Sequence, residues 1–370
     1  MKLVEETISM FSPFLDVKKE QTTYKIKYVS SYIEKWLLVV TNVKEVKRIN
    51  FIDCMCNAGI YSDGEIGTAM RALELFNAFA ANHPEKEFNL ILNDINPERI
   101  KAITYVAKNV VGINASNISI KTHNKDVNVL LSDDFYFNKL FNCYPNRSAN
   151  LVFVDPYNFC TVKISALEHF LSDKYCELIF NIFTNDYVRN QKTAKMKEYC
   201  SSEGIPLCSK AELVKIITER LKTGNIKYSF SYEFKISTNT ELYQIMFFTP
   251  SIRGLEKLKE ALWETFDGKQ FHRNEEKNED QLSFFTKEDV RDSRLDSYSN
   301  DARELLIQNF SGQTVDFSVI EEFIIENTML NQSHIITKIL KPLISDNRIK
   351  KLGNVQRASN FKSDKYLIGE

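Results

Sequence analysis

The chain has 370 residues, 43% of them hydrophobic, so it is long enough for two domains and can bury a sizeable core. Its formal net charge of -1 excludes a basic field over the whole molecule and leaves nucleic-acid contact to a local patch. The 7 cysteines form no C-x-x-C pair and the 5 histidines no H-E-x-x-H motif, so neither a disulfide framework nor a zinc site is indicated. With no signal peptide and no run near the roughly 18 apolar residues of a membrane span, we expect a reduced, cytoplasmic protein without membrane contact.

Strand and helix patterns alternate through most of the chain. After a charged segment at 16–21, apolar residues recur at helical spacing from Tyr24 to Val40. Strand patterns follow at 48–53, 88–92, 118–121, 151–154 and 178–183, and then at 228–236 and 242–249, which resemble an antiparallel pair. This order predicts an α/β fold: a Rossmann-like, seven-stranded, mostly parallel sheet with helices on both faces. Near the start of the first helix, Lys25 and Lys27 are either solvated or placed so that one reaches a phosphate or carboxylate of a ligand.

A small-residue turn follows the first strand of this sheet. The strand ends at Asp53, the turn contains Asn57, Ala58 and Gly59, and a helix rich in Ala and Leu comes next. Strand, tight turn and helix let backbone N–H groups approach a nucleotide-like ligand. We therefore assign Asp53 and the three turn residues to a cofactor site.

Acidic residues follow four of the predicted strands: Asp53, Asp94, Asp126 and Asp155. Each alone could simply cap the next helix. Taken together they suit a nucleoside cofactor such as S-adenosylmethionine, with Asp94 accepting hydrogen bonds from ribose hydroxyls and Asp126 reading an adenine amino group. An NAD site is a poor match, because G-x-G-x-x-G is absent and Asp94 lies 35 residues after Gly59 instead of roughly 20.

The sequence Asp155-Pro156-Tyr157 is the candidate reactive centre. A proline turn after a buried strand can aim a carboxylate at an exocyclic amine, and an adjacent aromatic ring can stack on a base. Such a site would act by orienting the amine lone pair toward a methyl donor. The alternative is that Asp155 caps a helix and Tyr157 is a wall residue.

Composition changes after Phe266. Residues 267–300 are mostly polar and charged and predict a linker or irregular arm, with 282–285 as an apolar anchor. From Asp301, three helical patterns (305–310, 317–326 and 332–343) precede a hairpin pattern at 348–353 and 365–368. Three helices and a hairpin indicate a winged helix-turn-helix domain over 301–370.

Charge is polarised within this last domain. Residues 301–330 hold one base against six acids, whereas 331–370 hold eight bases against three acids. Basic charge on the third helix and the wing is what a DNA-binding winged helix needs, although a solvated face or a protein-binding winged helix would show it too. The candidate nucleic-acid-binding residues are Lys338, Lys341, Arg348, Lys350, Lys351 and Arg357.

These stretches together resemble the three-Cys-motif partner protein family, a group of class I, Rossmann-like methyltransferase homologues. The resemblance rests on Tyr24-Lys25-Ile26-Lys27, on 51–67 around Asn57-Ala58-Gly59, on Val154-Asp155-Pro156-Tyr157, and on 242–248 followed by 253–255. It implies a methyltransferase-type domain over 1–266, S-adenosylmethionine as cofactor, and an attached winged helix. It also implies a partner with a three-cysteine motif that resembles radical S-adenosylmethionine proteins, and a mobile-element or defence context.

The sequence leaves two main readings open, and a different nucleotide-dependent enzyme on the same sheet is a weaker third. The first is a methyltransferase that acts on nucleic acid, favoured by Asp94 and by Asp155-Pro156-Tyr157. The second is a non-catalytic scaffold of the same fold that binds nucleic acid or a partner. It is favoured by the turn, where Cys54-Met55-Cys56 precedes Asn57-Ala58-Gly59 and one glycine and the proline of the family pattern are missing.

Overall fold

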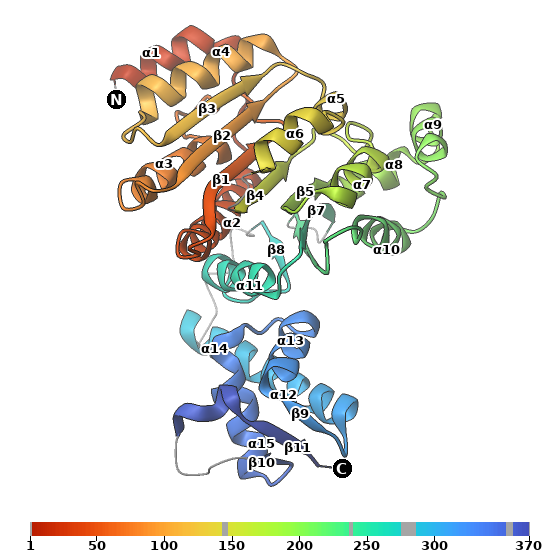
Figure 1. Cartoon of the computed structure of the whole chain (residues 1–370). Helices are drawn as coiled ribbons and strands as arrows, with labels where there is room; N and C mark the ends of the chain where they lie inside the picture. The colour runs from red at the N-terminus through yellow and green to blue at the C-terminus, as the bar shows by residue number, and fades with distance from the viewer. Residues whose placement is uncertain (1, 143–146, 237–239, 275–285, 353–357, 370) are drawn as a thin grey trace. The chain divides into compact units, whose positions relative to one another are not determined.

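The chain forms two compact units in the computed structural model, which describes residues 2–142, 147–236, 240–274, 286–352 and 358–369. The first unit comprises Met1–Ser251 with Phe271–Asn274, and the second comprises Ile252–Gln270 with Glu275–Glu370. Figure 1 traces both along the chain. The division falls before the helix at 252–266, which the sequence assigned to the first domain.

The first unit is built on a mixed sheet with the strand order β3-β2-β1-β4-β5-β7-β6-β8. Its strands are β1 (Val46–Asp53), β2 (Glu87–Asn93), β3 (Ile118–His123), β4 (Arg147–Val154), β5 (Glu177–Ile182), β6 (Tyr228–Lys235), β7 (Glu241–Thr249) and β8 (Phe271–Arg273). Strands β1 to β5 pair in parallel, and β7 runs antiparallel to both β5 and β6. The predicted strands and the antiparallel pair are confirmed, but the sheet has eight strands, because the three-residue strand β8 adds in parallel to β6.

Helices cover both faces of this sheet (Figure 1). They are α1 (Lys2–Phe11), α2 (Glu20–Val40), α3 (Thr68–Ala80), α4 (Pro97–Tyr105), α5 (Val127–Leu131), α6 (Asp134–Phe141), α7 (Ile164–Asp173), α8 (Thr184–Asn190), α9 (Ala194–Ser202) and α10 (Lys210–Leu221), with short helical turns at Ser12–Phe14 and Val106–Val111. Helix α2 begins at Glu20, earlier than the periodicity indicated, and its N-cap residue Lys19 makes no side-chain cap.

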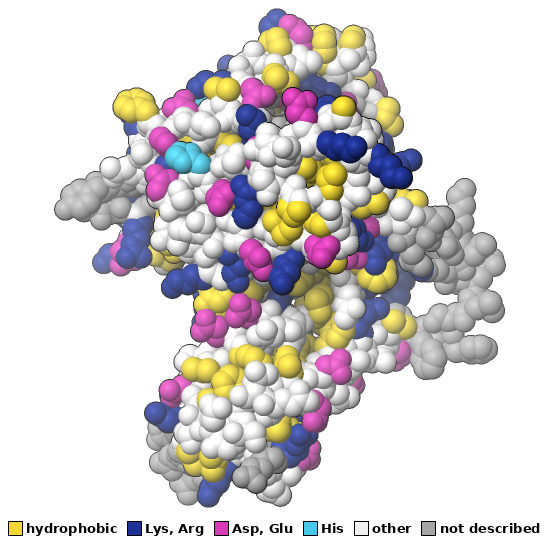
Figure 2. Space-filling view, turned by 90° about the vertical axis from the view of Figure 1, so that its right-hand side faces the viewer, with side chains coloured by type: hydrophobic (Ala, Val, Ile, Leu, Met, Phe, Trp, Pro, Cys, Tyr) yellow, Lys and Arg dark blue, Asp and Glu magenta, His cyan; other side chains and the backbone are white. Residues whose placement is uncertain are grey.

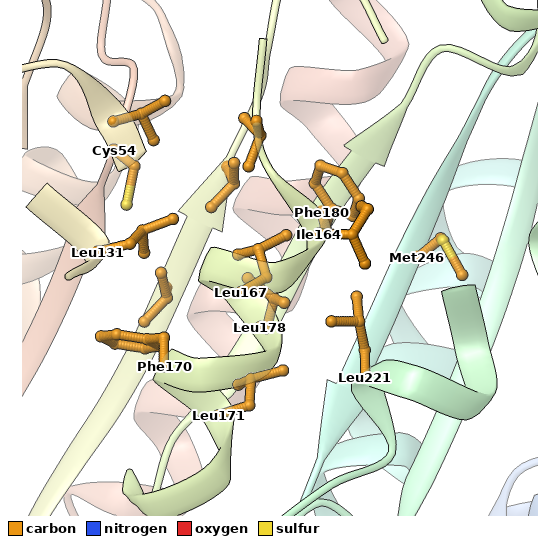
Figure 3. Close-up of a cluster of buried hydrophobic side chains, with 14 of the residues drawn as sticks. Cys54, Leu131, Ile164, Leu167, Phe170, Leu171, Leu178, Phe180, Leu221 and Met246 are labelled. Atoms are coloured by element: carbon orange, nitrogen blue, oxygen red, sulfur yellow. The ribbon is translucent and has the colours of Figure 1, made fainter. Parts of the chain in front are cut away.

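Alternate residues of the strands enter the two halves of the core, as a strand period of two requires. Ile52 and Val152 join Leu178 and Phe180 in one buried cluster with α5, α6, α7 and α10 (Figure 3). On the other face, ring contacts tie Tyr32 of α2 to Phe247 and Phe76 of α3 to Phe88. Burial on both faces explains why the central strands are almost wholly apolar.

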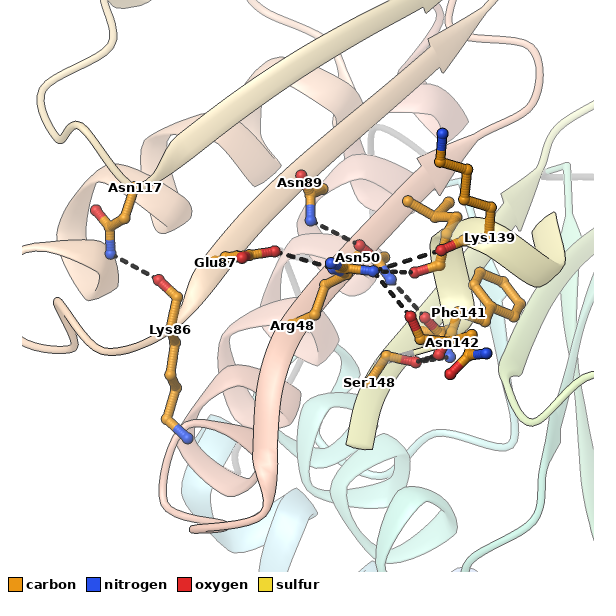
Figure 4. Close-up of polar contacts among 12 residues, drawn as sticks. Arg48, Asn50, Lys86, Glu87, Asn89, Asn117, Lys139, Phe141, Asn142 and Ser148 are labelled. Atoms are coloured by element: carbon orange, nitrogen blue, oxygen red, sulfur yellow. Dashed lines mark hydrogen bonds and ion pairs between the residues drawn. The ribbon is translucent and has the colours of Figure 1, made fainter. Parts of the chain in front are cut away.

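A row of buried asparagines interrupts this apolar interior. Asn50 of β1 lies opposite Asn89 of β2 and Asn150 of β4 in the strand register. Its side chain accepts a hydrogen bond from Asn89 Nδ2 at 3.0 Å and donates one to Asn150 Oδ1 at 2.7 Å (Figure 4). Nearby, Arg48 Nη1 donates to the carbonyls of Leu140 and Asn142 at the end of α6. The polar groups are thus paired across three strands, which satisfies buried amides that would otherwise be costly.

The second unit combines helices with a small antiparallel sheet of order β10-β11-β9. Its elements are α11 (Ile252–Phe266), α12 (Lys287–Phe310), β9 (Thr314–Asp316), α13 (Phe317–Asn327), α14 (Gln332–His334), η4 (Ile335–Leu340), α15 (Lys341–Ser345), β10 (Ile349–Leu352), η5 (Ala358–Ser363) and β11 (Lys365–Ile368). Leu306, Ile320 and Ile339 are fully buried in it. The predicted helices and hairpin lie at these positions.

The prediction of an irregular arm over 267–300 is wrong where the structure describes it from Lys287 on. Helix α12 starts there, behind a capping box in which the Thr286 hydroxyl accepts from the Asp289 N–H and the Asp289 carboxylate accepts from the Thr286 N–H. The predicted anchor at 282–285 lies outside the described residues.

Among the described helices, none combines the length and the apolar character that crossing a bilayer requires. The cysteines that the structure describes are all free thiols.

Candidate functional site

A cavity of about 980 Å³ opens at the carboxyl edge of the parallel strands in the first unit. Strand β2 pairs with one edge of β1, and β4 pairs with the other edge. The direction of the strand order therefore reverses at β1. Ligands of open α/β sheets bind at such a switch point, outside the carboxyl ends of the strands. The cavity wall is built from the 16–25 segment, the turn after β1, the Asp155 loop, α8 and the start of β7.

The turn after β1 is held in a left-handed backbone conformation. Asn57 has φ 56° and Gly59 has φ 76°. A Cβ atom added at Gly59 would lie 2.6 Å from Ile103 Cγ1, so this position accepts only glycine. Asn57 is a residue type that tolerates positive φ, and its backbone N–H donates to Asp94 Oδ2 at 3.1 Å. The turn therefore keeps a tight shape although it lacks one glycine of the family pattern.

Asp53 is a nearly fully buried carboxyl group in the cavity wall. Its Oδ1 accepts a hydrogen bond from the Met55 N–H at 3.1 Å. Burial is the largest effect on this group and raises the pKa of Asp53 to about 8. The Met55 hydrogen bond opposes this rise, the nearby carboxylates of Asp155 and Asp94 add to it, and Lys25 opposes it least. At neutral pH Asp53 is therefore mostly protonated and can donate as well as accept a hydrogen bond.

Asp155 lies at the centre of a polar cluster. Its Oδ2 forms an ion pair with Lys25 Nζ of α2, and its Oδ1 accepts from Asn181 Nδ2 at 2.7 Å. Lys25 also lies 5.6 Å from the centroid of the Tyr243 ring. Both oxygens of the carboxylate are thus engaged by the chain itself. The capping alternative does not apply, because Asp155 bonds these two side chains and the next helix, α7, starts only at Ile164.

Tyr157 is 48% exposed and lines the cavity beside Pro156. The guanidinium of Arg99 lies 5.2 Å from its ring centroid, and Arg99 Nη1 contacts its hydroxyl group. Arg99 also forms an ion pair with Asp16 at 3.0 Å, whose other oxygen accepts from Asn57 Nδ2 at 2.5 Å. One face of the predicted stacking ring is therefore covered by a cation.

The other predicted cofactor residues lie outside the cavity wall. Asp94 is 3% exposed and accepts hydrogen bonds from the Asn57 and Asn96 N–H groups. It therefore stabilises the turn after β1 from inside the protein. Asp126 is exposed and caps α5 through the Asn128 N–H at 2.8 Å, the alternative that the sequence had left open. Ala58 is buried against Phe11 of α1. Of the predicted cofactor set, the structure brings Asp53, Asn57 and Gly59 together at the cavity.

No sequence pattern assigned a role in this site to Asp16 or Arg99. Asp16 belongs to a charged segment that the pattern marked only as a loop, and Arg99 follows the proline that opens α4. Lys18 anchors the same segment through ion pairs with Asp63 and Glu65. The charged residues of 16–25 could have indicated a polar site. Their spacing did not indicate which residues they pair with.

The predicted nucleic-acid-binding residues lie in the second unit, and several are paired with acids. Lys338 forms an ion pair with Asp296, Arg348 with Glu304, and Lys351 with Asp364. Lys341 and Lys350 are exposed, and Arg357 lies outside the described residues. On the face shown in Figure 2, basic and acidic side chains are interspersed. These ion pairs offset part of the excess of basic residues counted in 331–370.

Comparisons with known proteins find similarity among solved structures. No protein-family profile and no curated protein matches the chain. Among solved structures, it is similar to a mutant of the 16S rRNA (adenine(1408)-N(1))-methyltransferase from Catenulisporales acidiphilia, with 11% identity and a TM-score of 0.27, over 58% of this chain and 91% of that one. Because the TM-score is below 0.5, the α/β assignment rests on the strand order and not on this likeness.

Proposed function

We propose that this protein is an S-adenosylmethionine-dependent methyltransferase that acts on nucleic acid, at an exocyclic amino group of a base. The observation that carries the proposal is a single cavity at the switch point of the sheet that meets both the turn at Asn57–Gly59 and the Asp155-Pro156-Tyr157 loop. A cofactor-type turn and an amine-binding carboxylate on one cavity are the two parts that methyl transfer to an amine requires.

The residues of the cavity fit a nucleoside that carries an amino-acid group. The turn at Asn57 and Gly59 brings the backbone close to the cavity, and Asp53 offers a carboxyl group that can accept or donate a hydrogen bond. The buried Nε of Arg99, whose side chain lines the cavity, has no hydrogen-bond partner within the described part of the chain. When bound, S-adenosylmethionine supplies a methyl group activated on a sulfonium.

Asp155 is the residue that would act on the acceptor amine. In its ion pair with Lys25 it is a carboxylate, and a carboxylate only accepts hydrogen bonds. It would therefore bind an N–H of the amine and orient the nitrogen lone pair, which is catalysis by positioning. Tyr157, with its rim exposed and Arg99 on one face, would limit how a base enters.

The test of the enzyme is binding followed by transfer. Calorimetry with S-adenosylmethionine should show binding to the wild type, and transfer of labelled methyl groups to DNA and RNA should follow. Asp155→Asn should retain binding and lose transfer by about 100-fold or more, a typical effect of removing a positioned proton-accepting group. No binding of S-adenosylmethionine by the wild type would refute the proposal.

For the second unit we propose a winged helix-turn-helix that contacts the phosphate backbone through Lys341 and Lys350. Replacing both by Glu should weaken DNA or RNA binding and lower the slope of log affinity against log salt by about 1 per lysine lost. Lys108→Glu with Lys121→Glu, two exposed lysines of the first unit, is the matched control. Binding that ignores salt, or that the double variant leaves intact, would count against phosphate contact.

The second candidate function is a non-catalytic scaffold that binds nucleic acid or a three-Cys-motif partner. It is favoured by the pairing of both Asp155 oxygens and both Asp94 oxygens within the chain. A scaffold would bind nucleic acid with the salt dependence above, yet transfer no methyl group to any DNA or RNA. The transfer assay therefore separates the two candidates.

A further inference from the structure

The Lys25 side chain brings a primary amine to Asp155. Lys25 Nζ is paired with Asp155 Oδ2, and the lysine side chain is only 10% exposed. Asn181 fixes the opposite oxygen of the same carboxylate at 2.7 Å. The nitrogen of Lys25 thus takes the place at which the proposed function puts the acceptor amine.

The wall around this amine is aromatic. The Tyr243 ring centroid lies 5.6 Å from Lys25 Nζ, and Tyr61 and Phe183 line the same cavity. Aromatic faces bind methylated ammonium groups through cation–π attraction. Lys27, two residues along the same helix, is exposed and does not line the cavity. The environment of Lys25 therefore suits both a lysine amine and its methylated product.

We propose that Lys25 is itself a methyl acceptor, so that the protein methylates its own α2 helix. One proton of the Lys25 ammonium passes to the Asp155 carboxylate, and the freed lone pair forms the N–CH₃ bond as the S–CH₃ bond of the sulfonium donor breaks. The donor leaves as a neutral thioether, Lys25 becomes a methylammonium, and Asp155 releases its proton to water. This inference rests on the proposed function, because S-adenosylmethionine is the donor.

Methylation preserves the contact that holds Asp155. A methylated lysine keeps its positive charge, so the ion pair survives while one N–H is replaced by a methyl group. An external amine that uses Asp155 must first displace this nitrogen. Lys25 and a nucleic-acid substrate therefore compete for one carboxylate, and added substrate should slow the modification.

The experiment uses the full-length protein and S-adenosylmethionine with a labelled methyl group, without nucleic acid. We expect label on Lys25, located by tandem mass spectrometry of the peptide that contains it, at a rate per molecule that does not depend on protein concentration. The intact mass is measured first, because a methyl group already on Lys25 of the isolated protein would also support the proposal.

Three variants complete the design. Lys25→Arg keeps a cation beside Asp155 and should abolish the label, whereas the matched control Lys27→Arg should leave it unchanged. Asp155→Asn should slow labelling by about 100-fold or more. Thermal unfolding of each variant identifies one that has failed to fold, and the localisation on the wild type depends on no variant.

The outcomes separate this inference from the function on which it rests. If calorimetry shows S-adenosylmethionine bound but Lys25 stays unmodified, self-methylation is wrong and the methyltransferase proposal stands. Label on Lys19 or Lys27 in place of Lys25 overturns it equally. If the donor does not bind at all, both proposals fail.

Discussion

Glu177, the first residue of β5, is a buried carboxyl group between two hydroxyl donors. The Tyr32 hydroxyl donates to Oε2, and Thr249 Oγ1 donates to Oε1 at 2.8 Å. Burial is the largest effect on this group and raises its pKa from 4.5 to about 7, although both hydroxyl contacts oppose the rise. Folding therefore favours the protonated form of this side chain.

This shift predicts a pH dependence of stability. Between pH 4.5 and about 7 the folded protein holds a proton that the unfolded chain releases, so the free energy of unfolding should fall as the pH rises through this window, by up to about 3 kcal/mol. Glu177→Gln should remove this part of the dependence. Urea unfolding across the window measures it, with the exposed Glu5→Gln as control. Equal slopes for Glu177→Gln and wild type would contradict the prediction.

At the cavity, the sequence predicted the residues that backbone geometry fixes. Strand β1 ends at Asp53, Gly59 lies in the turn that follows, and Asp155 directly follows β4. Because β1 and β4 are parallel neighbours, the topology of the sheet brings these residues to one edge. Asp94 and Asp126 also follow strands, but their oxygens bond backbone N–H groups of the next turn. The position of an acidic residue after a strand does not show whether it binds a ligand or caps the next helix. Both kinds of residue occur at that position.

Long-range charge pairs were beyond prediction for a different reason. Lys25 meets a residue 130 positions away, and Arg99 meets Asp16 across 83 positions. Such partners depend on how helices pack over the sheet, which local pattern does not encode. Lys25 was a candidate from its place near a helix start, but its partner within the chain, Asp155, could not be read from that place.

Among the elements, the central strands are joined by the asparagine row as well as by their backbone. Asn50, Asn89 and Asn150 are each less than a tenth exposed, and Asn150 Nδ2 also donates to the Tyr175 carbonyl at 2.8 Å. Removing one member leaves buried donors or acceptors without partners. Replacing two neighbours together leaves neither partner of their shared hydrogen bond unsatisfied.

This predicts coupled mutational effects in β1 and β2. Asn50→Leu should destabilise the protein by about 2–4 kcal/mol, because the Asn89 amide and the Asn150 carbonyl oxygen lose their partner. Asn50→Leu with Asn89→Leu should cost less than the sum of the two single changes. Urea unfolding of the four proteins in a double-mutant cycle measures the coupling. Additive effects would show that the row contributes nothing as a unit.

Helices were predicted where they bury an apolar stripe and missed where they do not. The apolar periodicity from Tyr24 revealed most of α2, whereas the buried residues of α12 begin only at Ser299. The first half of α12 is mostly polar and charged, which composition cannot distinguish from an irregular arm. The capping box from Thr286 to Asp289 was the available signal for its start.

For the whole molecule, the division between the units falls before α11. Trp263 of α11 donates from Nε1 to the Met329 carbonyl at 2.7 Å, and Lys259 Nζ contacts the carbonyls of Ile325 and Thr328 at the end of α13. These contacts satisfy carbonyl groups that a helix end leaves open. A boundary at Asp301 ignores them, because the composition shift marks only where the chain becomes polar.

Two fragments test this division. A fragment of residues 252–370 should unfold cooperatively, whereas residues 301–370 should be markedly less stable, because it lacks α11 and the first half of α12. Circular dichroism during thermal unfolding compares them, and the full chain provides the reference. Similar midpoints for both fragments would restore the boundary that the composition suggested.

The segment 16–25 presents charges of both signs to whatever fills the cavity. Asp16 is paired with Arg99, and Lys25 is paired with Asp155. An occupant that broke only one of these pairs would leave a partly buried charge, that of Arg99 or Lys25, without its partner, which is costly. An amino-acid group carries both signs, so it can take the place of both partners at once.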